Sequence, residues 1–232
     1  MNGMVHIYCG DGKGKTTAAL GLALRAAGNG VPVMIVRFLK NDGSGEVGIL
    51  ENVPGVYLFP CERQFGFTWT MSEEQKAEAG EYFTELFERA WEMGCKTVRE
   101  DVEGAGKADG CMAGENWGSD SVSDGSSRRD IGVCGTGSSV SGSPVSAPLT
   151  SPPCEIRALL VLDEIMAAVN SGFVANERLL AALDHRPDGL EVVLTGRGPS
   201  EELLSRADYV TEMRAVKHPY EKGVGARKGV EY

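Results

Sequence analysis

The sequence has no excess of basic residues and no long apolar run. Its 23 Lys and Arg residues stand against 33 Asp and Glu residues, which gives a formal net charge of −10. Binding to a phosphate backbone depends on clustered positive charge, so we expect no nucleic-acid partner. A membrane span needs about 20 consecutive apolar residues, and no stretch approaches that length. The first residues also lack the basic and apolar regions of a secretory signal. We expect a soluble cytoplasmic protein with no membrane partner.

Patterns for disulfides and for His/Cys metal sites are also missing. The six cysteines form no C-x-x-C pair, and His185 and His218 have no metal-ligand spacing with each other or with a cysteine. His6 lies in the first expected strand, and we interpret it as a core residue. A chain of this length does not need disulfides for stability, so we interpret the cysteines as reduced thiols. No Ser or Cys stands with a positioned base, which argues against a nucleophilic side chain.

Composition divides the chain into two flanks and an insertion. Residues 101–154 contain 11 Ser, 10 Gly and 4 Pro, with few large apolar side chains. Such a segment buries too little apolar surface to offset the entropy that is lost on ordering. We therefore expect 101–154 to be a disordered, low-complexity, Ser/Gly-rich insertion. Residues 1–100 and 155–232 then form one nucleotide-binding domain, and together they are long enough for a single core.

Short apolar segments alternate with helical patterns in both flanks. This alternation predicts an α/β fold of the P-loop (RecA-like) type, in which a mostly parallel sheet carries helices on both faces. A capping-box pattern, Ser72 with Gln75, marks the start of one helix. Strands are expected at 4–9, 33–38, 56–59, 158–162, 190–194 and 209–213, and helices at 15–27, 72–91, 177–183 and 199–207.

The strongest chemical signal lies between the first strand and the first helix. It reads Gly10-Asp11-Gly12-Lys13-Gly14-Lys15-Thr16-Thr17. Glycines allow a backbone to approach phosphates closely, a helix start presents free N–H groups, and Lys15 adds a mobile charge. The strict P-loop pattern fails by one position, because Cys9 stands where its first Gly should be. We still expect a phosphate-binding loop whose Thr16 holds a magnesium ion.

Two further strand ends should lie beside this loop. Asp163 and Glu164 follow a buried apolar strand, so Asp163 is placed to orient a magnesium ion and Glu164 to polarise water or to bind substrate. The next strand ends in Thr195-Gly196-Arg197, and the fork of Arg197 suits phosphate or carboxylate. A plain turn with a solvated Arg197 is the alternative.

An aromatic cluster at 65–69 includes Phe67 and Trp69. These rings fold onto the core or form the wall of a pocket for a large flat ligand, and the residues alone leave both options open. The residues alone therefore predict that the protein binds a nucleoside triphosphate, magnesium and an unidentified second substrate.

Taken together, these segments resemble the P-loop type of ATP:corrinoid adenosyltransferase. The shortened P-loop, which departs from the common pattern, is the form that this family carries. The resemblance covers about three quarters of the chain and rests on Gly10–Thr17, Arg37–Lys40 with Gly45-Glu46, Phe67–Trp69, Val161–Glu164, Leu194–Arg197, Val216–His218 and Gly229–Tyr232. The insertion at 101–154 is not typical of the family.

The resemblance implies transfer of the 5′-deoxyadenosyl group of ATP to the Co(I) centre of a corrinoid, with release of triphosphate, in cobalamin biosynthesis or salvage. It implies catalytic roles for Lys13, Lys15, Asp163 and Glu164, with Mg²⁺ or Mn²⁺ held by Thr16 and Asp163. ATP would contact Gly10 to Thr17 and Arg197, and the corrinoid would contact Phe67 and Trp69. Lys40 and Glu46 would be additional contacts whose separate roles the resemblance does not define.

The resemblance further implies a homodimer and a flavoprotein as the source of electrons. Neither property is visible in the residues themselves. Two other functions remain open from the P-loop and Asp163 alone: a phosphoryl-transfer ATPase or small-molecule kinase, and a nucleotide-dependent interaction module without catalysis. The first would yield ADP, whereas an adenosyltransferase yields triphosphate.

Overall fold

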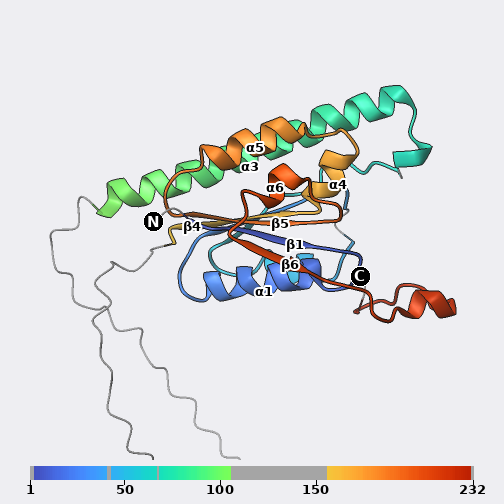
Figure 1. Ribbon diagram of the computed structural model, residues 1–232. Helices are drawn as coiled ribbons and strands as arrows, with labels where there is room; N and C mark the ends of the chain where they lie inside the picture. The colour runs from blue at the N-terminus through green and yellow to red at the C-terminus, as the bar shows by residue number, and fades with distance from the viewer. Residues whose placement is uncertain (1–2, 41–42, 67, 106–155, 231–232) are drawn as a thin grey trace, which may run out of the picture. The chain divides into compact units, whose positions relative to one another are not determined.

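Six parallel strands form one sheet in this computed structural model, in the order β3-β2-β4-β5-β1-β6 (Figure 1). The structure describes residues 3–40, 43–66, 68–105 and 156–230, without the side chains of 69 and 101–105. Since the strands are parallel, their carboxyl ends meet at one edge of the sheet. The strands are β1 (Val5–Cys9), β2 (Val33–Arg37), β3 (Val56–Leu58), β4 (Ala158–Asp163), β5 (Leu190–Thr195) and β6 (Tyr209–Glu212).

The burial of each strand follows its place in the sheet. Every residue of β2, β4 and β5 is buried, whereas β1 alternates between buried and half-buried residues and the edge strand β6 is exposed throughout. Strands that are covered on both faces must be apolar on both faces, which explains the continuous apolar sequences of β4 and β5.

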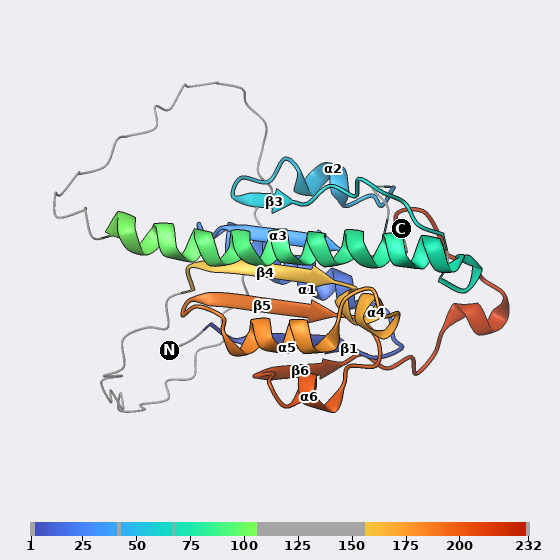
Figure 2. The same ribbon diagram turned by 90° about the horizontal axis from the view of Figure 1, so that it is seen from above.

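Helices cover both faces of the sheet. On one face α1 (Lys15–Ala27) packs Ala19 and Ala23 against side chains of β2, β4 and β5. The opposite face carries α3, α4, α5 and α6, which are drawn above the sheet in Figure 1 and in front of it in Figure 2. The further helices are α2 (Val47–Leu50), α3 (Glu73–Ala105), α4 (Ile165–Asn170), α5 (Asn176–Asp184) and α6 (Glu201–Leu204), with 3₁₀ turns η1 (Thr68–Thr70) and η2 (Pro219–Lys222).

The long helix α3 begins at the expected capping box. The Ser72 hydroxyl accepts a hydrogen bond from the Gln75 amide at 3.2 Å, and the Gln75 side chain accepts one from the Ser72 amide at 2.9 Å. These two bonds satisfy N–H groups that have no partner inside the helix. The apolar stripe of α3, with Phe83, Phe87 and Ala90, enters the core of this face.

The fold class, the parallel sheet and the helices on both faces are confirmed. The expected helix at 199–207 is shorter, because Ser200 caps α6 by accepting a hydrogen bond from the Leu203 amide at 3.2 Å, and Pro199 therefore precedes the cap. The helix α4 was not expected. The backbone of α3 continues to Ala105, past the expected boundary at 101, and 106–155 lie outside the described residues.

Within the part of the chain that the structure describes, no helix is both long enough and apolar enough to cross a membrane.

Candidate active site at the carboxyl edge of the sheet

The glycine-rich segment 10–14 forms the turn between β1 and α1. Gly14 is the N-cap of α1 with φ 111°, a left-handed conformation that glycine adopts without steric cost. The turn is hydrogen-bonded to the segment that follows β6, because the Gly12 amide donates to the Met213 carbonyl at 2.7 Å. This arrangement presents the amino end of a 13-residue helix at the sheet edge, where backbone N–H groups attract anions.

Lys15 lies folded against its own loop. Its ammonium group donates to the Gly10 carbonyl at 2.8 Å and to the Gly12 carbonyl at 2.9 Å, and the residue is only 7% exposed. Burial lowers the pKa of Lys15 below its ordinary value, and the positive charge of Arg197 adds to this effect, whereas Glu164 opposes it. The loop therefore holds a buried cation whose charge an anionic ligand would stabilise.

A hydrogen-bond network joins the loop to two neighbouring strands. Thr16 Oγ1 donates to Asp163 Oδ1 at 2.9 Å, and Thr195 Oγ1 donates to the same oxygen at 2.6 Å. The Glu164 amide in turn donates to Thr195 Oγ1 at 2.9 Å. These bonds fix the carboxylate of Asp163, which is fully buried at the end of β4.

Lys40 completes the network from the end of β2. Its ammonium group donates to Thr16 Oγ1 at 2.9 Å and forms an ion pair with Asp163 Oδ2. The preceding residue, Leu39, has φ 54°, which is rare for a residue with a branched side chain. Backbone strain of this kind persists only where the surrounding contacts maintain it.

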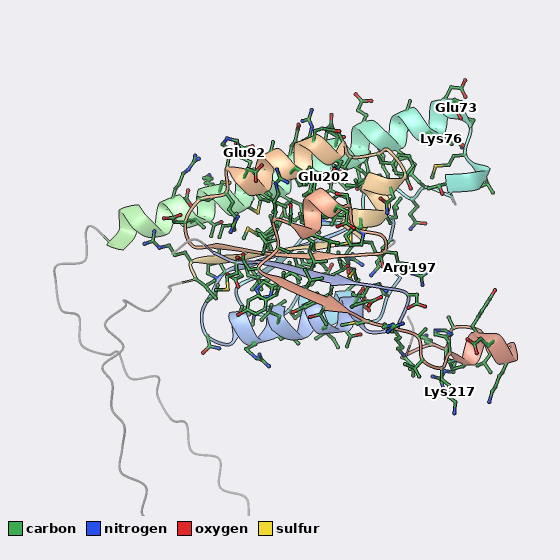
Figure 3. All side chains as sticks on the ribbon, viewed as in Figure 1. Glu73, Lys76, Glu92, Arg197, Glu202 and Lys217 are labelled. Carbon is green, nitrogen blue, oxygen red and sulfur yellow. The ribbon has the colours of Figure 1, made fainter. Side chains whose placement is uncertain are left out.

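The segment after β6 closes one side of the loop. The Asp11 carboxylate accepts a hydrogen bond from the Ala215 amide at 3.1 Å, and this bond lowers the pKa of Asp11. Beside Lys13 lies a cavity of about 570 Å³, whose cationic lining residues are Lys13, Arg214, Lys217 and Arg227. Figure 3 shows Lys217 on this C-terminal segment. Lys13 therefore contributes to both the glycine-rich loop and this cationic cavity.

The other expected residues lie at the same edge or outside the described part. Glu164 caps α4 at φ 60°, and Thr17 belongs to the first turn of α1. Arg197 is exposed at the end of β5, as Figure 3 shows, and it influences the pKa of Lys15 without a direct bond to the loop in the described contacts. Phe67 lies outside the described residues.

The aromatic segment borders a second cavity. Trp69 belongs to the 3₁₀ turn η1, and its side chain is among those not described. Phe65 packs against Phe83, with ring centroids 5.4 Å apart. A cavity of about 320 Å³ is lined by Leu39, Lys40, Phe65, Phe83 and residues near them. This cavity reaches the network at Asp163 through Lys40.

Sequence reasoning gave no defined role to two residues of the network. Lys40 was expected only as an additional contact without a defined role, and Thr195 only as part of a turn. A signal for Thr195 was present, because it is a hydroxyl residue at the end of the strand that follows the Asp163 strand. The signal for Lys40 is weaker, since it needs the knowledge that β2 pairs with β4.

Comparison with known proteins agrees with the family that the sequence resembles. The chain is 30% identical over 231 residues to the corrinoid adenosyltransferase CobA of Salmonella typhimurium, an alignment that covers 99% of this chain and 86% of the relative. It is 28% identical to the corrinoid adenosyltransferase of Pseudomonas aeruginosa, with 99% and 84% covered, and 28% identical to that of Escherichia coli K12, with 99% and 86% covered. The model of the family ATP:corrinoid adenosyltransferase BtuR/CobO/CobP matches residues 1–101 and 147–232. This chain therefore belongs to the ATP:corrinoid adenosyltransferase family, whose members are enzymes.

Proposed function

We propose that this enzyme transfers the 5′-deoxyadenosyl group of ATP to the Co(I) centre of a corrinoid at the carboxyl edge of its sheet, and that it releases triphosphate. Family membership supports the reaction class. The observation that carries the assignment to this edge is the hydrogen bond between Thr16 and Asp163, because it joins the phosphate-binding loop to the carboxylate of β4. The reaction serves cobalamin biosynthesis or salvage.

The reaction places unusual demands on a P-loop. The electron pair of Co(I) forms the new bond to C5′, the C5′–O bond breaks, and the whole triphosphate leaves with the bonding pair. The protein therefore needs no nucleophile and no general base. Its task is to hold ATP in line with the cobalt and to stabilise the negative charge that grows on the leaving group.

The residues of the loop suit this task. The amides at 10–14 and the amino end of α1 would bind the triphosphate, together with the side chains of Lys15, Lys13 and Arg197. The buried ammonium of Lys15 gains most from such an anion, because burial already disfavours its charge. The cationic cavity beside Lys13 supports binding of the phosphates that lie furthest from the cobalt. Asp11 and Thr17 would complete the nucleotide contacts at the two ends of the loop.

Thr16 and Asp163 are proposed to hold Mg²⁺ or Mn²⁺. The residues fit such an ion, because both supply oxygen atoms at one point, 2.9 Å apart. The residues that the structure describes contain no group of three or more His, Cys, Asp or Glu that could hold a metal. Magnesium accepts phosphate and water oxygens as its remaining ligands. When bound, it would neutralise part of the triphosphate charge, and Glu164 would orient a water molecule beside it.

The corrinoid is proposed to lie on the side of the aromatic segment. The cavity with Phe65, Phe83 and Lys40 supports this side. Phe67 and Trp69 would place apolar rings against the corrin and exclude a lower axial ligand, so that the cobalt is reduced more easily. In that case Trp69→Ala lowers turnover more with an enzymatic electron donor than with chemically reduced corrinoid. Equal losses with both donors would contradict this role.

Three further properties belong to the same proposal. Residues 1–100 and 155–232 form the adenosyltransferase domain, and 101–154 are an insertion. The enzyme acts as a cytoplasmic homodimer, and a flavoprotein supplies its electrons. Sedimentation of the purified chain tests the dimer, and turnover of cob(II)alamin with added flavodoxin and its reductase tests the electron donor.

The decisive experiment is anaerobic incubation of the enzyme with ATP, Mg²⁺ and chemically reduced cob(I)alamin. We expect a light-sensitive alkyl corrinoid and one triphosphate for each corrinoid consumed. Lys15→Met should abolish both products, whereas Lys76→Met should not, because Lys76 lies on the surface of α3 and pairs there with Glu73. ADP without alkylation would contradict the proposal and favour phosphoryl transfer.

A further inference from the structure

We propose that Lys40 is an exchangeable counter-ion of the metal site: its ammonium group and the divalent cation compete for the same oxygens of Thr16 and Asp163. Binding of the metal–ATP complex therefore expels Lys40 toward the cavity beside Phe65. This inference rests on the metal-holding role that is proposed above for Thr16 and Asp163.

Lys40 already contacts both groups that are proposed to hold the metal. The Thr16 hydroxyl donates its only proton to Asp163 Oδ1, at 2.9 Å. Its lone pairs face Lys40, whose ammonium lies 2.9 Å away and also pairs with Asp163 Oδ2. A metal ion held by the same Thr16 and Asp163 oxygens would lie where the ammonium group lies now. Two cations at one small site repel each other strongly, so the metal and Lys40 compete for it.

Burial indicates which partner moves. The Asp163 side chain is 1% exposed, and Thr195 fixes it through a 2.6 Å hydrogen bond. The Lys40 side chain is 26% exposed. A buried carboxylate without a compensating cation is costly, so the site favours occupation by one cation or the other. The Lys40 ammonium can therefore be hydrated when it leaves, whereas Asp163 stays held by the hydroxyls of Thr195 and Thr16.

The surroundings of Lys40 indicate where it goes. Lys40 lines the cavity of about 320 Å³ together with Leu39, Phe65 and Phe83. Because Lys40 already lines this cavity, rotation of its side chain is sufficient for the exchange. Expulsion from Asp163 adds a positive charge to the cavity that is proposed for the corrinoid, and nucleotide binding thereby changes the second substrate site.

Binding of Mn²⁺ to the protein without nucleotide or corrinoid tests this competition. Free Mn²⁺ is measured by its electron paramagnetic resonance signal at pH 8, for the full-length chain and its variants. Lys40→Met should bind Mn²⁺ at least about tenfold more tightly than the unchanged protein, because a like charge has been removed from the site. Lys40→Arg keeps the charge and should bind weakly, and Lys76→Met is the matched control with a lysine on the surface of α3. Equal or weaker Mn²⁺ binding by Lys40→Met would overturn the proposal.

A second measurement needs no variant and guards against a misfolded Lys40→Met. Reductive methylation of the unchanged protein should label Lys40 faster when Mn²⁺ is added, while the rate at Lys76 stays constant. If Mn²⁺ binds and the Lys40 rate does not rise, the competition is disproved. Asp163→Asn separates the two proposals: retained Mn²⁺ binding would contradict the metal site itself, whereas lost binding with no effect of Lys40→Met would contradict only the exchange.

Discussion

Thr16 Oγ1 donates a 2.9 Å hydrogen bond to Oδ1 of Asp163, a residue 147 positions further along the chain. The bond joins the first turn of α1 to the last residue of β4. It is possible because β1 and β4 are parallel strands of one sheet, with β5 between them, so that both end at the same edge. A hydroxyl and a carboxylate that meet in this way can share one metal ion, and the site is therefore formed by topology rather than by local sequence.

Thr195 is expected to position Asp163. Thr195→Val removes the hydroxyl that donates to Asp163 Oδ1 and accepts from the Glu164 amide, with little change in volume. Loss of such an outer contact should weaken Mn²⁺ binding and lower kcat by roughly 10- to 100-fold. The affinity for ATP without metal should change little. Titration of Mn²⁺ and steady-state kinetics measure these effects.

Thr195→Ser supplies the control for that variant. It keeps the hydroxyl and removes only a methyl group, so metal affinity and kcat should return close to the original values. If Thr195→Val retains its metal affinity and Thr195→Ser loses it, packing of the methyl group and not the hydrogen bond holds Asp163.

Gly196 is expected to be essential for stability. It has φ 147°, and a Cβ atom at this position would lie 2.6 Å from Cβ of Met166 in α4. Gly196→Ala should therefore lower the free energy of unfolding by about 2–4 kcal/mol, through backbone strain and overpacking. Denaturant unfolding measures this loss.

Gly21→Ala is the matched control, since Gly21 lies inside α1 and no atom stands within 4 Å of its added Cβ. Alanine should raise the stability there by about 0.5–1 kcal/mol. If Gly196→Ala changes the free energy of unfolding only slightly while Gly21→Ala raises it as expected, α4 moves easily away from β5.

Local signals allowed much of this fold to be predicted. The helix α1 begins at Lys15 and ends at Ala27, as expected, because the glycines at 14 and 28 bound it. The capping box at Ser72 and the strands before Asp163 and Thr195 were equally readable. In each case the determining contacts lie within a few residues of the element, and propensity and capping therefore decide its ends.

The remaining features depend on pairing between distant strands. The strands β1 and β2 follow each other along the chain with only α1 between them, but β5 and β4 lie between them in the sheet. This order places β2 and β5 on either side of β4, and so brings Lys40 and Thr195 to Asp163. No local pattern specifies that order, which is why the roles of these two residues could not be assigned. The network at Asp163 is a consequence of strand order.

The insertion can be tested by removal. Every residue proposed for the site lies in 1–100 or 155–232, so replacing 108–153 with a short Gly/Ser linker should leave the affinity for ATP and kcat within about twofold. Binding and steady-state assays of the shortened chain measure this. Loss of ATP binding in a shortened chain that still unfolds cooperatively would show that the segment contributes to the site.

The lowered pKa of Lys15 predicts a distinctive pH dependence. Desolvation is the main cause of the shift, so Lys15 loses its proton at a lower pH than an ordinary lysine. The proposed binding of triphosphate would need the charged form of Lys15. The affinity for ATP should therefore fall as the pH rises through the lowered pKa, before exposed lysines titrate near pH 10.4. Lys15→Arg keeps its charge throughout this range and should show a flatter profile, even if it binds more weakly. Parallel profiles for both proteins, measured calorimetrically from pH 7 to 10, would mean that another group controls nucleotide binding.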